Sequence, residues 1–140
     1  MSLSLTFDTL YKYNTAVEGI EMPVQLSVGN QPVIVPDAKL DTGSTFCIFE
    51  QGYCAALGLT LENGYPQRIE TAMGTFLSYG HEVSLLAMDC EFTTTVFFAA
   101  LPGFFRNVLG RRGWLDRLRL GVVDYDGELY ASLYNETARL

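Results

Sequence analysis

The sequence is organised around the stretch Ala38-Lys39-Leu40-Asp41-Thr42-Gly43-Ser44-Thr45-Phe46-Cys47-Ile48. An acid, a hydroxyl, a glycine and a second hydroxyl follow directly on a β-run, and another apolar run then begins. A carboxylate so placed lies at the end of a rigid strand, and the glycine allows a sharp turn and a close approach to a neighbouring segment. The hydroxyls can hydrogen-bond the carboxylate and orient it. Taken alone, the tetrapeptide also suits an Asx or ST turn, and a turn is the favoured interpretation.

Two further segments accompany Asp41, in order along the chain. The stretch Arg68-Ile69-Glu70-Thr71-Ala72-Met73-Gly74-Thr75-Phe76-Leu77 predicts a strand, a tip of small residues and a returning strand. About 65 residues after Asp41, Arg106-Asn107-Val108-Leu109-Gly110-Arg111 places apolar residues before a glycine. A helical turn is predicted next, from Trp114 to Leu118. With these segments present, an active site becomes the favoured interpretation of Asp41.

Together, an Asp-Thr-Gly-Ser on a strand, a Thr-Ala-Met-Gly hairpin and an Asn-Val-Leu-Gly-Arg segment resemble the retropepsin-like aspartic proteases. The resemblance spans about residues 23–133 and depends on the ordered triple, since each segment alone is common. It implies a mostly β fold, a small closed β-barrel of the acid-protease type with one or two short helices and one lobe per chain. It also implies an aspartic endopeptidase that hydrolyses peptide bonds.

The resemblance carries over residue by residue. Asp41 matches the single catalytic aspartate of each chain. Thr42 matches the residue that hydrogen-bonds across a dimer, and Gly43 and Ser44 complete the active-site loop. The flap that folds over the substrate is matched by Thr71, Ala72, Met73, Gly74 and Thr75. The element that crosses behind the catalytic loop is matched by Val108, Leu109 and Gly110, and the helix that follows it by the turn at Trp114.

The chain holds one Asp-Thr-Gly, which is half of an aspartic-protease site. The chemistry needs two carboxylates that share one proton, one acting as base toward the attacking water and one as acid toward the carbonyl oxygen. The aspartates Asp89, Asp124 and Asp126 lack the complete motif. We therefore expect the second carboxylate from a second copy across a two-fold axis, in a homodimer. The expected substrate is an extended peptide or protein, and no cofactor is expected.

Two features depart from the retroviral pattern. Thr45 and Phe46 stand where viral members commonly carry an acid, which leaves Arg111 without its familiar partner. The flap has one glycine, Gly74, where viral flaps often have several. The catalytic loop is intact, so these departures indicate a cellular or bacterial relative.

Composition restricts the class of protein. The 140 residues are 49% hydrophobic and 18% charged, with nine Phe and eight Tyr, which excludes a disordered chain and favours one domain with one core. The net charge of −7 argues against nucleic-acid and acidic-membrane partners. Three scattered cysteines and the lack of a signal-peptide pattern favour a cytoplasmic protein with free thiols. The predicted division is an N-terminal extension of uncertain role (1–22), the retropepsin-like domain (23–134) and a C-terminal tail (135–140).

Apolar and polar residues alternate over short runs, which predicts eight or nine strands. One predicted hairpin covers residues 24–35, and another flanks Asp126-Gly127, a dipeptide suited to a tight turn. Leu3, Leu5 and Phe7 alternate in the same way. Helical spacing occurs at residues 49–57, closed by Gly58, and at the Trp114 turn.

Other chemistry-bearing residues have simpler interpretations. His81 is expected on a strand surface, Cys47 as a buried thiol, and no metal site is expected. The Asn135-Glu136-Thr137 sequon is expected not to be glycosylated. A basic cluster is interpreted as solvated helix surface; its residues are Arg106, Arg111, Arg112, Arg117 and Arg119. The aromatic residues late in the chain are interpreted as core or as cleft lining; they are Phe97, Phe98, Phe104 and Phe105.

Two other functions compete with the protease. A dimeric module with the same fold would bind or scaffold extended peptides without cutting them. A thiol enzyme would use Cys47 with His81, and alkylation of Cys47 would then abolish its activity. The intact Asp-Thr-Gly-Ser favours the protease, because a pure binder gains little from two facing carboxylates that repel each other.

Overall fold

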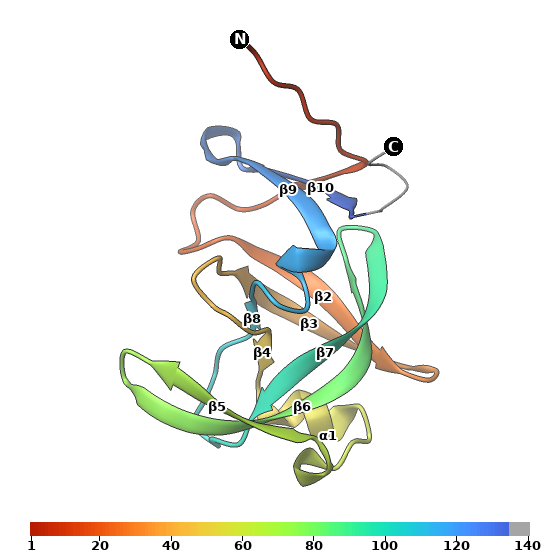
Figure 1. Cartoon of the computed structure of the whole chain (residues 1–140), viewed down its shortest axis with the longest axis vertical. Coiled ribbons are helices and arrows are strands. Elements are labelled where there is room, and N and C mark those ends of the chain that lie inside the picture. The colour runs from red at the N-terminus through yellow and green to blue at the C-terminus, as the bar shows by residue number, and fades with distance from the viewer. Residues whose placement is uncertain (135–140) are drawn as a thin grey trace.

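The computed structural model describes residues 1–134, in which ten strands and one short α-helix are found (Figure 1). The predicted C-terminal tail and the Asn135-Glu136-Thr137 sequon lie outside these residues. The strands are β1 (Thr9–Lys12), β2 (Glu21–Val28), β3 (Gln31–Leu40), β4 (Ile48–Phe49), β5 (Tyr65–Thr71), β6 (Gly74–Ala87), β7 (Cys90–Ala99), β8 (Val108–Leu109), β9 (Leu118–Val123) and β10 (Glu128–Leu133). The helical elements are α1 (Gln51–Ala56) and the 3-10 turns η1 (Leu61–Asn63), η2 (Leu115–Arg117) and η3 (Asp124–Asp126).

Six strands close into an uneven ring. The larger sheet has the order β2-β3-β8-β4-β7-β6-β5, and β2 pairs additionally with β6. This pairing sets Leu26 against Leu85, so that the ring contains every strand of the sheet except β5. Alternate residues of β2, namely Met22, Val24 and Leu26, are buried inside it. The predicted closed, mostly β barrel is therefore confirmed.

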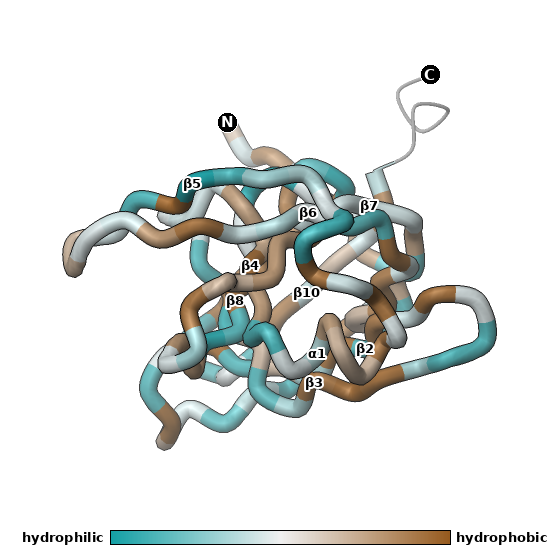
Figure 2. The backbone as a smooth tube through the Cα atoms, turned by 90° about the horizontal axis from the view of Figure 1, so that it is seen from below, coloured by the Kyte–Doolittle hydropathy of each residue, from teal (hydrophilic) through white to brown (hydrophobic). Residues whose placement is uncertain are grey.

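The hairpin of β5 and β6 forms an arm that extends from the ring (Figures 1 and 2). β6 has 14 residues, and its second half belongs to the ring while its first half pairs with β5. The pairing runs out to Thr71 opposite Gly74, so Ala72 and Met73 alone make the turn. The hairpin predicted from the small residues at its tip is present.

A second sheet contains three strands in the order β1-β10-β9. β1 pairs with β10 of the same chain, with Thr9 opposite Ala131. The expected strand through Leu3, Leu5 and Phe7 was wrong, since residues 1–7 contain no strand and Leu3 and Leu5 are exposed. A strand needs a hydrogen-bonded neighbour, and the chain begins to pair with β10 only at Thr9.

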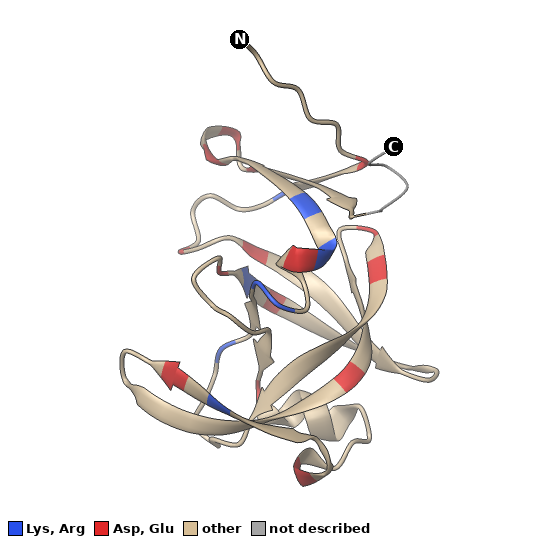
Figure 3. Cartoon of the chain, viewed as in Figure 1, with Lys and Arg blue, Asp and Glu red and all other residues tan. Residues whose placement is uncertain are grey.

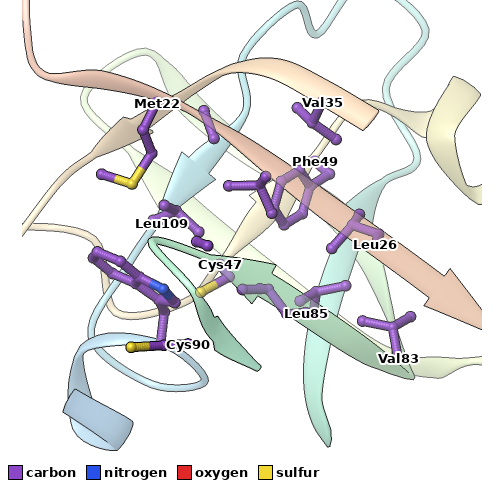
Figure 4. Packing of buried hydrophobic residues seen from close by; sticks show 14 of the residues in the cluster. Met22, Leu26, Val35, Cys47, Phe49, Val83, Leu85, Cys90 and Leu109 are labelled. Carbon is purple, nitrogen blue, oxygen red and sulfur yellow. The ribbon is translucent and has the colours of Figure 1, made fainter. Parts of the chain in front are cut away.

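The core fills the ring. Its largest fully buried side chains include Trp114, Phe49, Phe98, Met22 and Leu26. Figure 4 shows Cys47 among Leu109, Leu85 and Phe49. A smaller cluster of Ile48, Ile69 and Ala99 packs against Phe46, Phe76 and Phe104 at the base of the arm.

Of the two predicted helices, only the first is an α-helix. It covers Gln51–Ala56, and Gly58 closes it with a φ of 75°. The predicted helical turn at Trp114 is present as the 3-10 turn η2. Leu118 already has extended backbone angles and pairs with Leu133, so the β9 ladder ends the helical turn after three residues.

The predicted hairpin at Asp126-Gly127 exists with a longer loop. Residues 124–127 connect β9 to β10, and only Gly127 has a positive φ, of 65°. The loop also contacts the segment after β1, where the Tyr13 hydroxyl donates to the Asp124 carboxylate and the Tyr13 N–H donates to the Gly127 carbonyl. Within residues 1–134, no helix is long and apolar enough to cross a bilayer.

Candidate active site

Asp41 directly follows β3 and is fixed by β8. Leu40 is paired with Leu109 in parallel register, and the Asp41 N–H donates to the Leu109 carbonyl at 3.0 Å. Because β8 lies between β3 and β4, the backbone before the carboxylate has little freedom. The ring therefore sets the direction in which the catalytic loop leaves the sheet.

The Asp41 carboxylate closes its own loop. Its Oδ1 accepts the Gly43 N–H at 2.9 Å, and its carbonyl accepts the Ser44 N–H at 3.1 Å. The expected hydroxyl contact was wrong for Ser44, because its Oγ donates instead to the Phe46 carbonyl at 2.7 Å. The backbone amide of Gly43 does the orienting. The other carboxylate oxygen, Oδ2, accepts no hydrogen bond from residues 1–134.

Gly110 lies directly behind the catalytic loop, where no side chain fits. A Cβ at this position would lie 2.2 Å from the Phe46 carbonyl oxygen and 2.8 Å from that of Ser44. The close approach allows the Arg111 N–H to donate to the Ser44 carbonyl at 2.9 Å and the Arg112 N–H to the Thr45 carbonyl at 2.8 Å. Cys47 completes this support, since its Sγ accepts the Gly110 N–H at 3.4 Å.

Asp41 opens into a cleft of about 680 Å³. The cleft lies between the catalytic loop, β5 and the segment that leads into β8. Of the predicted site residues, it brings together Asp41, Gly43, Ser44, Thr71 and Val108. The lining is completed by Phe104, which the sequence suggested as core or cleft lining, and by residues that the sequence did not assign to the site: Thr45, Phe46, Ile48, Gln67, Arg68, Ile69, Glu70, Phe76 and Arg106.

The remaining predicted site residues lie outside the cleft lining. Leu109 and Gly110 are buried behind the loop. Thr42 faces a second hollow of about 530 Å³, together with Arg111 and Asp116. The tip of the β5–β6 hairpin, where the flap is predicted, lies outside this lining; its exposed residues are Ala72, Met73, Gly74 and Thr75.

The tip of the β5–β6 hairpin is a self-contained turn. The Thr71 hydroxyl donates to the Gly74 carbonyl at 2.9 Å, and the Met73 N–H donates to the Thr71 hydroxyl at 3.2 Å. Gly74 has a φ of 129°, which residues with a side chain rarely adopt. Met73 is 96% exposed. One glycine is therefore enough to turn this hairpin, and the apolar side chain at its tip is left exposed.

The basic cluster was wrongly expected on a helix surface. Of its residues only Arg117 belongs to a helical turn, whereas Arg106 lines the cleft and Arg111 lines the hollow beside Thr42. Within residues 1–134 Arg111 makes no ion pair. Of the later aromatics, Phe97 and Phe98 are buried.

Cys47 is fully buried, and burial raises the pKa of its thiol to about 12. His81 lies elsewhere, with its Nε2 at 2.9 Å from the Leu61 carbonyl oxygen. No hydrogen bond joins the two residues in the part of the chain that the structure describes. The same 134 residues contain no group of three or more His, Cys, Asp or Glu that could hold a metal ion.

Two solved structures of proteases have a similar fold. A retropepsin-like aspartic protease from Rickettsia conorii matches with a TM-score of 0.60 and 18% identity, over 88% of this chain and 96% of that one. The EIAV protease complexed with the inhibitor HBY-793 matches with a TM-score of 0.50 and 18% identity, over 67% of this chain and 83% of that one. No protein-family model and no curated protein matches the sequence. The chain has the retropepsin-like fold, as its motifs predicted.

Proposed function

We propose that this chain is an aspartic endopeptidase that acts as a homodimer, with one Asp41 from each copy. The observation that carries the proposal is the position of Asp41. Its carboxylate stands at the end of β3, its loop is held from behind by β8, and one of its oxygens is free at the wall of a 680 Å³ cleft. A second copy across a two-fold axis would supply the partner carboxylate that residues 1–134 of one chain lack.

The two carboxylates would divide the chemistry between them. Like charges a few ångströms apart cannot both ionise, so the pair holds one proton. The unprotonated carboxylate takes a proton from water as the water oxygen attacks the peptide carbonyl carbon, and the protonated one donates to the carbonyl oxygen. The resulting tetrahedral intermediate collapses with cleavage of the C–N bond, and the leaving nitrogen receives a proton.

β5 is suited to bind an extended peptide. It is the last strand of its sheet, and consecutive residues from Gln67 to Thr71 line the cleft. Side chains alternate along a strand, so lining by consecutive residues means that the backbone edge faces the cleft. A substrate strand could pair with the free N–H and C=O groups of that edge.

The experiment is Asp41→Asn with Asp126→Asn as the matched control. The asparagine keeps the shape of the side chain and its hydrogen bond to Gly43 while removing acid–base function. We expect peptide-library cleavage to fall by a factor on the order of 10²–10⁴ in Asp41→Asn. Asp126 lies on the exposed loop after β9, so its variant keeps full activity.

The competing function is a dimeric module that binds peptides without cutting them. Wild-type protein that binds an extended peptide and leaves it intact through prolonged incubation supports the module and contradicts the protease. Cleavage that continues unchanged in Asp41→Asn contradicts the assignment of Asp41.

A further inference from the structure

The segment that leads into β8 forms one wall of the cleft. Phe104, Arg106 and Val108 line the cleft at every second position. The residues between them do not line the cleft: Phe105 lines a separate hollow of about 580 Å³, which Phe104 also borders, and Asn107 is buried. Side chains of an extended chain alternate in direction. Arg106 therefore belongs to the cleft face of this wall.

Asn107 anchors the wall beside Arg106. Its Oδ1 accepts the Glu50 N–H at 3.0 Å, and its Nδ2 donates to the Glu50 carboxylate at 2.7 Å and to Asp37 at 3.3 Å. Its carbonyl accepts the Lys39 N–H at 2.8 Å. The backbone that carries Arg106 is thus fixed to β3 and to the start of α1. The amide of Asn107 engages the acids Glu50 and Asp37, whereas Asp41 and Glu70 line the cleft itself.

Arg106 carries an uncompensated charge. It is exposed, and within residues 1–134 it makes no ion pair and no side-chain hydrogen bond. Arg68 on β5 lines the same cleft and is likewise unpaired among the described residues. Figure 3 shows basic bands on β5 and on the segment before β8, in a protein whose net charge is −7. Arg68 and Arg106 thus line this cleft together with the acids Asp41 and Glu70, in a protein in which acids predominate overall.

The floor next to Arg106 is apolar. The Phe76 and Phe104 rings lie 5.0 Å apart, and they pack against Ile48 and Ile69. A side chain bound here would lose part of its water shell. A guanidinium strengthens its hydrogen bonds to a carboxylate under such conditions and can hold both oxygens at once.

We infer that Arg106, with Arg68 in support, forms a subsite for an acidic side chain of the substrate. The cleft would select extended peptides in which an Asp or Glu lies near an apolar residue at the cleavage site. Glu70 lies farther along β5 toward the hairpin tip, where its charge would repel an acidic side chain of the substrate. The preference for an acid is therefore restricted to substrate positions near Arg106. This inference rests on the proposed function, whose cleft it uses.

The test compares peptides that differ only by Glu or Gln at one position, scanned across the scissile bond. These side chains have the same shape, so the ratio of their kcat/KM values isolates the charge. We expect a preference for Glu of about ten-fold at one position, weakening as salt is raised. In Arg106→Gln the ratio falls to about one, and in Arg106→Glu the preference shifts to a Lys peptide. Arg119→Gln, a change of the same chemistry on β9 and away from the cleft lining, keeps the wild-type ratio.

A wild-type ratio near one at every position overturns the inference, as does a Glu preference that survives in Arg106→Gln. A binding assay separates this failure from failure of the protease. Asp41→Asn protein is titrated with the fluorescent Glu and Gln peptides, because binding does not require cleavage. Glu selectivity that Arg106→Gln abolishes supports the subsite even if the wild type cuts no peptide. Equal binding of both peptides, or none, overturns it.

Discussion

The two oxygens of the Asp41 carboxylate differ in their hydrogen bonding. Oδ1 closes the loop by accepting the Gly43 N–H, and Oδ2 accepts no hydrogen bond from residues 1–134. The turn and active-site interpretations of Asp-Thr-Gly-Ser are therefore compatible, because the Asx-type turn orients the carboxylate that the chemistry needs. The sequence predicted the residue, while the identity of the orienting donor depended on backbone angles that composition does not reveal.

Cys47 should be chemically inert in the native protein. Its pKa is raised to about 12 from an ordinary value of 9.0, because burial disfavours the thiolate. At pH 8 we expect a thiol alkylating reagent to leave Cys47 unmodified and activity intact, and to label it after unfolding in urea, as read by mass spectrometry. Because the folded chain keeps the thiol proton to a higher pH than the unfolded chain does, the free energy of unfolding is unaffected by this group below pH 9 and decreases as pH rises from 9 toward 12.

Labelling of the urea-unfolded protein is the control, because it shows that the reagent reacts with Cys47 once the thiol is accessible. Rapid native labelling of Cys47 with parallel loss of peptide cleavage would instead support the thiol enzyme.

At the scale of elements, the site depends on a crossing of very short strands. β8 has two residues, yet Val108 pairs with Lys39 on one side and with Ile48 on the other. The next residues then pass directly behind the catalytic loop, which only a glycine at position 110 permits. Because β8 has only two residues, it supports the site through its pairing register. We therefore expect a shift in backbone position to disturb the site more than a change in buried area would.

Gly110→Ala should therefore be strongly destabilising. The added Cβ would overlap the carbonyl oxygens of Phe46 and Ser44, which are backbone atoms held in the loop. We expect the free energy of unfolding to fall by about 2–3 kcal/mol in urea titrations, and activity to fall with it. Gly52→Ala is the matched control, since Gly52 lies in α1 with open space around its Cα, and alanine there should stabilise the protein by about 0.5–1 kcal/mol. Equal stability of both variants would contradict the close approach.

The sequence predicts local structure better than it predicts the pairing of strands far apart in the chain. Alternation predicted the β2–β3 hairpin and the flap, and the ordered motifs predicted the retropepsin-like fold. The pairing of β1 with β10 joins residues more than 100 positions apart, and periodicity does not report such partners. Phe104 was expected as core or cleft lining and does line the cleft, but the place of Arg106 beside it was missed. Both lie in irregular chain, where periodicity does not show which side chains face a cleft.

At the scale of the whole molecule, one chain completes its barrel, and under the proposed function it supplies one of the two catalytic carboxylates. The hollow that holds Thr42 also holds Arg111, an exposed cation with no ion-pair partner among residues 1–134. Beside it, Asp116 already accepts the Gly113 N–H at 3.0 Å. A polar surface next to the catalytic loop fits the proposed contact between two copies, because it brings the two Asp41 loops together.

Activity should therefore require the dimer. We expect specific activity to fall on dilution below the dimer dissociation constant, with sedimentation showing monomer over the same concentration range. Thr42→Ala should weaken association by about 1 kcal/mol for each of two symmetry-related hydrogen bonds, or about 30-fold in Kd. Thr60→Ala is the matched control, because Thr60 is exposed at the start of η1 and its side chain makes no capping hydrogen bond. Mixing Asp41→Asn chains with wild type should reduce activity beyond simple dilution wherever subunits exchange. A chain that stays monomeric at high concentration and cleaves with unchanged specific activity would contradict the half-site proposal, since the second carboxylate would then have to come from the same chain.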